Sequence, residues 1–350
     1  MSKLKIGFVG VGNMGQCAHL RNYATLPDCE VVAIAELRPK LRQLVAQKYN
    51  IPRTYASHEE MLAKEKLDGI VAAQFFLNHG QLIPRLLEAK IPVFTEKPLA
   101  GSIEMGKRIV EAAERNNTFV MVGYHKRSDR ASQYARDVVR GFRDRRTIGK
   151  LKYIRILMPA GDWIAGGFSD LVQTDDPRPS LPHDPPPGDM NAESFKEYVS
   201  FVNYYIHQVN LMRFFLEEPY QVTHADPSGV LLVGKSESGI CCTIEMSPYQ
   251  TRIDWEESAL IAFEHGYVKL SLPAPLAMNR AGRVEVYRDP REGTLPDRSE
   301  PTFPWIHAMR AQAENFLKAI RKEAPPPCDA SEALQDLIVA REYLRLWKGV

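Results

Sequence analysis

A glycine-rich turn after the first apolar segment constrains the fold more than any other feature of this sequence. The apolar run Lys5–Val9 leads into it, and a helical pattern follows to about Thr25. The turn itself reads Gly10-Val11-Gly12-Asn13-Met14-Gly15. In this context the first glycine permits a tight turn, the second lets the backbone approach a pyrophosphate, and the third allows close helix–strand packing. The sequence therefore predicts a dinucleotide site at the end of a parallel strand.

Strand and helix patterns alternate from residue 4 to about residue 125. The strands should be buried on both faces, because they are almost wholly apolar. We predict strands at 5–9, 30–35, 67–73, 93–94 and 118–122, and helices at 14–25, 39–49, 80–89 and 102–116. This order is typical of an α/β doubly wound parallel sheet with helices on both faces.

After Gly149 the pattern changes to half-exposed strands, which predict an α+β domain with a large, mainly antiparallel open sheet. The strands are expected at 152–158, 229–233, 240–246, 258–264, 267–272 and 283–287, and the helices at 192–217, 305–322 and 329–347. The expected domains are 1–125, 126–328, and a C-terminal helix, 329–350, that packs back on the first domain. The proline-rich stretch 175–188 is either a mobile surface loop or an arm that closes the pocket or reaches a neighbouring subunit.

Composition excludes several classes of function. A net charge of +2 with 25% charged residues, and no dense basic stripe, argues against nucleic-acid binding. No apolar run reaches the length of a membrane span, and the first strand begins too early to leave room for a signal peptide. The five cysteines are odd in number and lack metal-ligand spacing. We therefore expect a cytoplasmic protein with reduced thiols and no metal.

Cofactor preference should depend on the end of the second strand. Glu36 can accept both hydroxyls of the adenosine ribose, which favours NAD and repels a 2′-phosphate. Arg38 leaves NADP open, because its guanidinium could pair with that phosphate. Gln74, Asn78 and His79 follow the third strand and are expected to border the nicotinamide. For His79 the alternative is a packing residue at the start of a helix.

A lysine follows the fourth predicted strand, in the segment Glu96-Lys97-Pro98. Ligands of open parallel sheets bind at the carboxyl ends of strands, so this segment and the glycine-rich turn should face one crevice. Lys97 would then reach the reacting atoms. Glu96 would contact the cofactor ribose or hold Lys97.

One predicted helix carries a narrow polar stripe on an otherwise apolar surface. Within 196–216 the polar residues recur at spacings of 4, 3, 4 and 3, and they are Lys196, Ser200, Asn203, His207 and Asn210. Unpartnered buried polar groups cost about 1–3 kcal/mol each, so such a stripe suits a wet pocket that binds hydroxyl groups. The alternative is an internal hydrogen-bond network that ties the helix to the sheet.

Taken together, these motifs resemble the Gfo/Idh/MocA oxidoreductases, which include glucose–fructose oxidoreductase and inositol dehydrogenase. The matching features are Gly10-x-Gly12-x-x-Gly15, Glu36, Asn78, Glu96-Lys97-Pro98, Gly123-Tyr-His-Lys-Arg127 and Gly149-Lys-Leu-Lys-Tyr. The resemblance implies a Rossmann domain, an α+β domain whose open sheet faces oligomer partners, and hydride transfer between a nicotinamide and a carbinol carbon of a sugar or cyclitol. It also implies a homodimer or homotetramer.

The resemblance assigns candidate roles and shows one departure. The family typically has Asp-x-x-x-His and a further acid on the striped helix, where this chain has Asn203, His207 and Asn210. An amide can orient a hydroxyl but cannot take its proton, so His207 becomes the expected base and Lys97 its partner. Further expected contacts are Arg127 to the cofactor, and Lys126, Asp162, Trp163, Asn203 and Asn210 to the substrate.

Three functions remain open. The first is an NAD-dependent sugar or cyclitol dehydrogenase acting on a CH–OH group. The second retains the cofactor and cleaves a glycosidic bond through oxidation, elimination and re-reduction. The third is a non-catalytic NAD-dependent sensor, against which the presence of both Lys97 and His207 argues.

Overall fold

The computed structural model describes residues 2–290 and 293–349, which form two compact units. The first unit comprises the chain up to Tyr124 together with 166–188 and 312–337. The second comprises 125–165, 189–311 and the chain from Ile338 onward. Both units are therefore assembled from segments that are distant in sequence. The domain boundaries expected above stay a prediction, since compactness alone does not define a domain.

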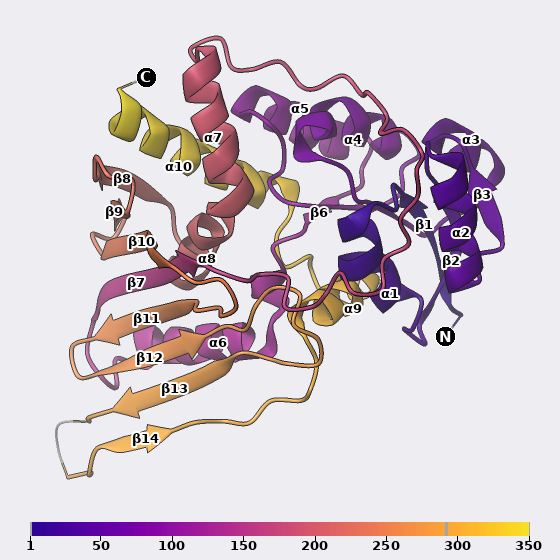
Figure 1. Ribbon diagram of the computed structural model, residues 1–350. Helices are drawn as coiled ribbons and strands as arrows, with labels where there is room; N and C mark the ends of the chain where they lie inside the picture. The colour runs from indigo at the N-terminus through magenta and orange to yellow at the C-terminus, as the bar shows by residue number, and fades with distance from the viewer. Residues whose placement is uncertain (1, 291–292, 350) are drawn as a thin grey trace. The chain divides into compact units, whose positions relative to one another are not determined.

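The first unit contains a six-stranded, all-parallel sheet in the order β3-β2-β1-β4-β5-β6 (Figure 1). Its strands are β1 (Leu4–Val9), β2 (Cys29–Ala35), β3 (Arg53–Tyr55), β4 (Gly69–Ala72), β5 (Val93–Thr95) and β6 (Val120–Val122). The chain order reverses between β1 and β4, which is where an open parallel sheet forms its binding crevice. The predicted doubly wound parallel sheet is confirmed.

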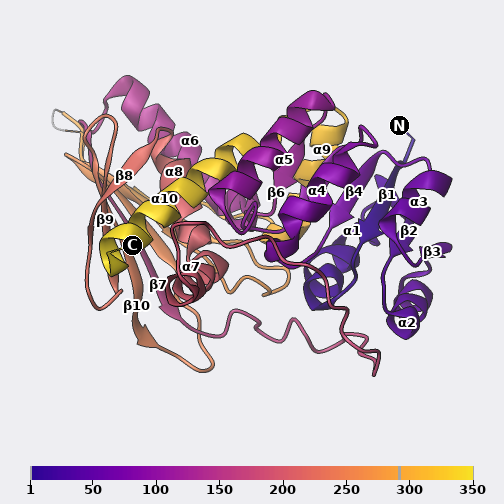
Figure 2. The ribbon, with the colours of Figure 1, turned by 90° about the horizontal axis from the view of Figure 1, so that it is seen from above.

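Helices cover both faces of this sheet, with α1 and α2 on one face and α4 and α5 on the other (Figure 2). The helices are the π-helix η1 (Gly15–Leu20), α1 (Arg21–Tyr23), α2 (Pro39–Tyr49), α3 (His58–Lys64), η2 (Phe76–Asn78), α4 (His79–Leu87) and α5 (Ile103–Arg115). Ser102 caps α5 by accepting a hydrogen bond from the Met105 amide. Helix α9 (Ala308–Ile320) adds Phe316 and Leu317 to the core of this unit.

The second unit contains an eight-stranded sheet in the order β14-β13-β12-β11-β7-β10-β9-β8. Its strands are β7 (Leu151–Ala160), β8 (Tyr220–Ala225), β9 (Leu231–Ser236), β10 (Cys241–Gln250), β11 (Ser258–Phe263), β12 (Gly266–Ser271), β13 (Arg283–Arg288) and β14 (Asp297–Ser299). All neighbouring strands are antiparallel except β7 and β10, which run parallel. The predicted large, mainly antiparallel sheet is thus confirmed.

Helices of the second unit gather on one face of this sheet (Figure 2). They are η3 (His125–Ser128), α6 (Arg130–Arg145), α7 (Ala192–Tyr204), α8 (Ile206–Leu216) and the end of α10 (Ala330–Lys348). Along β11 every second side chain is buried and the others are half-buried. The alternation indicates one face packed on helices and one open face.

The helices and strands predicted from the sequence did not include α6, β8 or the shortest strands, and they did not include one helix break. Strands β3 and β14 have three residues each, too few for a periodic pattern. The single helix predicted at 192–217 is two helices that meet at Tyr205, where the backbone has φ −94° and ψ −4°. The Tyr205 hydroxyl bonds Ser247 on β10, which ties the break to the sheet. The predicted polar stripe is therefore divided between α7 and α8.

Candidate functional site

The three glycines of the turn differ in what surrounds them. Gly10 has φ +84°, a conformation that side chains rarely adopt, and a Cβ there would lie 2.2 Å from Gln74 Nε2. A Cβ at Gly15 would lie 2.8 Å from the carbonyl oxygen of Gly10. A Cβ at Gly12 would lie 3.6 Å from Arg38 Nη2, its nearest neighbour. Gly12 is the one of the three where an added Cβ would meet only an ordinary contact, so the backbone there can be approached closely by a pyrophosphate.

Glu36 sits beside this cradle with both carboxylate oxygens engaged. Its Oε2 accepts hydrogen bonds from the Val11 amide (3.0 Å) and Arg38 Nη2 (3.1 Å), and its Oε1 accepts from the Arg38 amide (3.1 Å) and Nε (2.8 Å). Burial alone would raise the pKa of Glu36, but the bonds from Arg38 and Val11 lower it overall. The carboxylate is thus ionised at neutral pH. Ribose hydroxyls could bind it only by replacing the guanidinium.

A cavity of about 670 Å³ opens above the glycine turn and Glu36. It brings together six of the predicted cofactor contacts, namely Gly10, Gly12, Glu36, Arg38, Gln74 and Asn78. Its wall also includes four residues that the sequence analysis did not name: Leu37, Phe75, His58 and Arg85. Five residues of the proline-rich stretch line it as well, namely Arg178, Pro179, Leu181, Pro182 and His183. Predicted contacts Asn13 and Met14 lie outside this lining, exposed and half-buried respectively.

The Glu96–Lys97–Pro98 segment follows β5 and is anchored by a residue from the first helix. Glu96 Oε1 lies 2.5 Å from His19 Nε2 on η1, and both side chains are buried. Burial raises the pKa of Glu96, but the bond from His19, followed by the nearby Lys97 charge, lowers it overall. Lys97 is half-buried, and its amide donates to Glu96 Oε2 (3.2 Å). The carboxylate therefore fixes the backbone at the lysine.

His79 is fully buried, and its ring bridges the ends of β4 and β5. Nδ1 lies 3.2 Å from the Pro98 carbonyl oxygen and 3.1 Å from that of Leu99. Nε2 lies 3.2 Å from the Thr95 hydroxyl and 3.3 Å from the Gln74 carbonyl oxygen, so both ring nitrogens have partners inside the protein. Burial lowers the pKa of His79, which keeps the ring neutral. This geometry supports the alternative reading, a packing residue that shapes the Lys97 loop.

In the second unit, His207 lies at the start of α8 beside a second histidine. The rings of His207 and His125 are 4.7 Å apart in a T-shaped arrangement. His207 is half-buried, whereas Asn203, Ser200 and Lys196 on α7 are exposed. The stripe expected on a buried helix therefore runs from the surface at Lys196 to a buried end at Asn210.

Buried polar pairs hold the first turns of α8. Arg127 Nε donates to Asn210 Oδ1 at 2.7 Å. Lys126 Nζ lies 2.9 Å from Glu257 Oε2, and Gln208 Nε2 donates to Glu257 Oε1 at 2.6 Å. Glu257, on the loop before β11, was missed because nothing near it in sequence marks it. Its carboxylate is buried beside α8. This chain has asparagines at the positions where the family typically has acids on that part of the chain.

Two predicted substrate contacts have local structural partners. Asp162 Oδ1 accepts hydrogen bonds from the Ile164 and Ala165 amides, both at 3.0 Å, and so shapes its own turn. The Trp163 carbonyl accepts from the Leu276 amide at 3.2 Å, and its side chain is half-buried. Their roles toward a substrate stay predictions.

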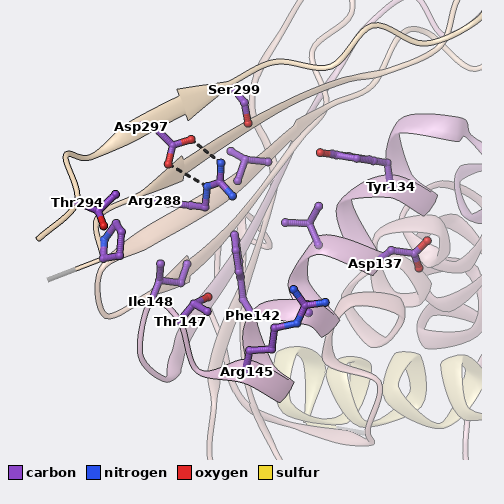
Figure 3. A pocket seen from close by; sticks show the side chains of 14 residues that line it. Tyr134, Asp137, Phe142, Arg145, Thr147, Ile148, Arg288, Thr294, Asp297 and Ser299 are labelled. Carbon is purple, nitrogen blue, oxygen red and sulfur yellow. Dashed lines mark hydrogen bonds and ion pairs between the residues drawn. The ribbon is translucent and has the colours of Figure 1, made fainter. Parts of the chain in front are cut away.

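A second cavity, of about 690 Å³, lies between α6 and strands β13 and β14 (Figure 3). Arg288 and Asp297 form a two-pronged ion pair at 3.0 and 2.6 Å in its wall, and Tyr134 and Phe142 belong to α6. None of the predicted site residues lines it. Among the described residues, no group of His, Cys, Asp and Glu is placed to hold a metal ion, and no helix is long and apolar enough to cross a membrane.

Comparison with known proteins supports a dinucleotide site at the glycine turn. The family described as "Oxidoreductase family, NAD-binding Rossmann fold", GFO_IDH_MocA, matches residues 4–124. Over these residues the chain is similar to the NAD-binding domain of the Gfo/Idh/MocA oxidoreductases. NAD is therefore the cofactor that the cradle and Glu36 fit.

Individual relatives extend the similarity over the whole chain. The chain is 23% identical to the rhizopine catabolism protein MocA of Rhizobium meliloti, over 99% of this chain and 96% of that protein. It is 25% identical to a myo-inositol 2-dehydrogenase of Thermotoga maritima, over 44% of each. An oxidoreductase from Agrobacterium radiobacter, crystallised with NAD+, L-tartaric acid and magnesium, shares the fold with a TM-score of 0.71 at 15% identity, covering 99% of this chain and 97% of that one.

Proposed function

We propose that this protein transfers a hydride between NAD and a ring carbinol carbon of a sugar, sugar derivative or cyclitol. The anchored Glu96–Lys97–Pro98 segment carries the proposal. A buried histidine on the helix that follows the phosphate-binding turn holds the carboxylate, and the carboxylate holds the lysine backbone. Such an arrangement suits a lysine that must be positioned with respect to a bound cofactor. The named relatives include an inositol dehydrogenase, which supports a polyhydroxylated substrate.

In this mechanism His207 takes the proton of the substrate hydroxyl, because imidazole is a suitable base near neutral pH. Lys97 donates to the same oxygen and stabilises the charge that develops on it. When bound, NAD supplies the hydride acceptor. Asn203, four residues before His207 on the other side of the helix break, orients a neighbouring hydroxyl. The remaining predicted contacts to the substrate are Lys126, Asp162, Trp163 and Asn210, with Arg127 on the cofactor side.

The buried polar pairs of the second unit support this assignment. Arg127 binds Asn210, and Glu257, paired with Lys126, binds Gln208, so two residues of α8 next to His207 are held by buried partners. A base must keep its orientation through turnover, and paired neighbours restrict the helix that carries it. In the first unit, the ionised Glu36 favours NAD over NADP.

The deciding experiment measures NADH formation by absorbance across free sugars, cyclitols, sugar acids and aryl glycosides, with NAD and NADP in parallel. One free polyol should give a clear signal with NAD. Lys97→Met should then lower turnover far more than Lys107→Met, a change on the exposed surface of α5. Turnover of Lys97→Met within about threefold of wild type contradicts the proposed mechanism, since a positioned acid–base group contributes about 10²–10⁴-fold.

The second candidate, cofactor-retaining glycoside cleavage, is favoured by one observation. Residues 178–183 line the cavity above the glycine turn, so a segment of the chain borders the path of the cofactor. A retained cofactor would be reduced and reoxidised within one cycle. Release of an aglycone in an NAD-dependent way, with no net NADH, would establish this candidate in place of the first.

We also propose that the open sheet face is covered by another copy of this chain, in a dimer or tetramer. Alternate residues of β11 on that face are only half-buried. None of the five cysteines, all of which lie in the described part of the chain, is in a disulfide, which supports a cytoplasmic location. Light scattering tests the assembly, and a monomer at micromolar concentration would contradict it.

A further inference from the structure

The proline-rich part of the chain has an ordered route across the first unit. We call residues 170–184 the strap; in Figure 1 they belong to the rose segment that precedes α7. The strap begins at η1 and α1. The Val172 amide donates to Gln16 Oε1 (2.9 Å), Gln16 Nε2 donates to the Val172 carbonyl (3.1 Å), and Arg21 pairs with Asp170.

The middle of the strap is fixed to the first turn of α2. Asp176 Oδ2 accepts a hydrogen bond from the Leu41 amide at 2.8 Å and another from the Thr174 hydroxyl at 2.8 Å. Asp175 forms an ion pair with Lys40 at 2.7 Å. The amide of Leu41 has no partner inside the helix, so Asp176 acts as a cap supplied from a distant segment.

The end of the strap is fixed to the start of α4. Asn78 Nδ2 donates to the Pro182 carbonyl at 2.8 Å. The buried carboxylate of Asp184 accepts from the Gly80 amide at 3.0 Å, and its own amide donates to the Leu77 carbonyl at 2.5 Å. The three anchors therefore lie on helices that follow β1, β2 and β4, at the carboxyl edge of the sheet where the dinucleotide binds.

The strap between the last two anchors lines the cofactor cavity. Arg178, Pro179, Leu181, Pro182 and His183 all face it. Leu181 is 40% exposed, and Leu37 and Phe75, also in the wall, are each 48% exposed. Three large apolar side chains exposed in one cavity need an apolar surface to cover them, and the flat adenine ring provides one. The prolines require no partners for backbone N–H groups and stiffen this roof.

We propose that the strap completes the NAD site, with Leu181 covering the adenine ring, and that cofactor exchange requires the strap to leave α2. The proposal uses the NAD-binding domain and not the identity of the substrate. Its failure can therefore be told apart from failure of the dehydrogenase assignment, since cofactor binding is measured without substrate.

The test follows NADH fluorescence in the stopped flow, as excess NAD displaces NADH from the full chain. Leu181→Ser should raise the dissociation rate about tenfold, equivalent to about 1.4 kcal/mol, because it removes apolar contact with the adenine ring. Asp175→Asn/Asp176→Asn should raise both association and dissociation rates severalfold, with a smaller change in affinity. Both sites are on the surface, so the variants should fold, which circular dichroism checks.

Matched controls are Leu346→Ser, at an equally exposed leucine (44%) on α10, and Asp144→Asn on the surface of α6. Both should keep the wild-type rates. If Leu181→Ser and the double aspartate variant stay within about twofold of wild type, the strap neither contacts nor confines the cofactor. Failure of the wild-type chain to bind NADH would overturn the proposal as well.

Discussion

His19 Nε2 lies 2.5 Å from Glu96 Oε1, and the pair joins the phosphate-binding helix to the lysine segment. His19 is on the π-helix that begins at Gly15, and Glu96 immediately precedes Lys97. The two residues are 77 positions apart in sequence. The element that would hold the pyrophosphate and the element that would touch the substrate oxygen are therefore linked by one buried contact.

Removal of this contact should weaken both stability and catalysis. His19→Leu leaves a buried carboxylate without its main side-chain partner, which should cost about 1–3 kcal/mol of unfolding free energy. Turnover should fall as well, since Lys97 loses its support. Urea unfolding and steady-state rates measure the two effects. His224→Leu, at an exposed histidine on β8, is the control and should change neither; equal behaviour of the two variants would contradict the linkage.

The lowered pKa of Glu96 predicts how this contribution depends on pH. The folded pKa lies below the ordinary value of 4.5, so the ionised form is the one stabilised by folding. The contribution is present above pH 4.5 and is lost as pH falls through the folded pKa. The stability advantage of wild type over Glu96→Gln should thus stay constant from neutral pH down to about 5 and shrink below that. An advantage that grows on acidification would reverse the sign and refute the assignment.

Local patterns in the sequence predicted the elements that carry the cofactor. The glycine turn, Glu36 and the lysine segment all lie at strand ends, and strand ends of a parallel sheet share one edge. This is why a list of short motifs could place Gly10, Glu36 and Gln74 around one cavity. Placing these motifs at one edge of the sheet requires knowing only which strands they follow, and not how the side chains pack.

Contacts between distant segments could not be predicted in this way. Glu257 and Lys126 are far apart in sequence, and Glu257 looks like an ordinary surface charge until the fold brings the two side chains together. The proline-rich strap was recognised as neither helix nor strand, but its route depends on Asp176 and Asp184, whose partners are backbone amides. Every residue except proline has a backbone amide, so the sequence does not indicate which amides these aspartates bind.

Glu36 and Arg38 together should decide between NAD and NADP. Arg38 donates twice to the Glu36 carboxylate and is thereby held away from other anions. Glu36→Ala should release the guanidinium, remove the acceptor for the ribose hydroxyls, and shift the NAD-to-NADP affinity ratio by at least about tenfold, or about 1.4 kcal/mol. Calorimetric titration with both cofactors measures the ratio. Glu30→Ala, at an exposed position on β2, should leave it unchanged.

The buried pair of Lys126 and Glu257 should be costly to break from one side only. Both side chains are almost fully buried, with 4% and 0% exposure, and lie 2.9 Å apart. Lys126→Met leaves an uncompensated charge, so it should destabilise the protein by about 3–5 kcal/mol, whereas Lys126→Met/Glu257→Leu should recover much of the loss. Arg140→Met, which breaks the exposed pair with Glu217, should cost no more than about 1 kcal/mol. Urea unfolding compares the variants, and a double variant less stable than Lys126→Met would show that Glu257 is held by Gln208 rather than by the lysine.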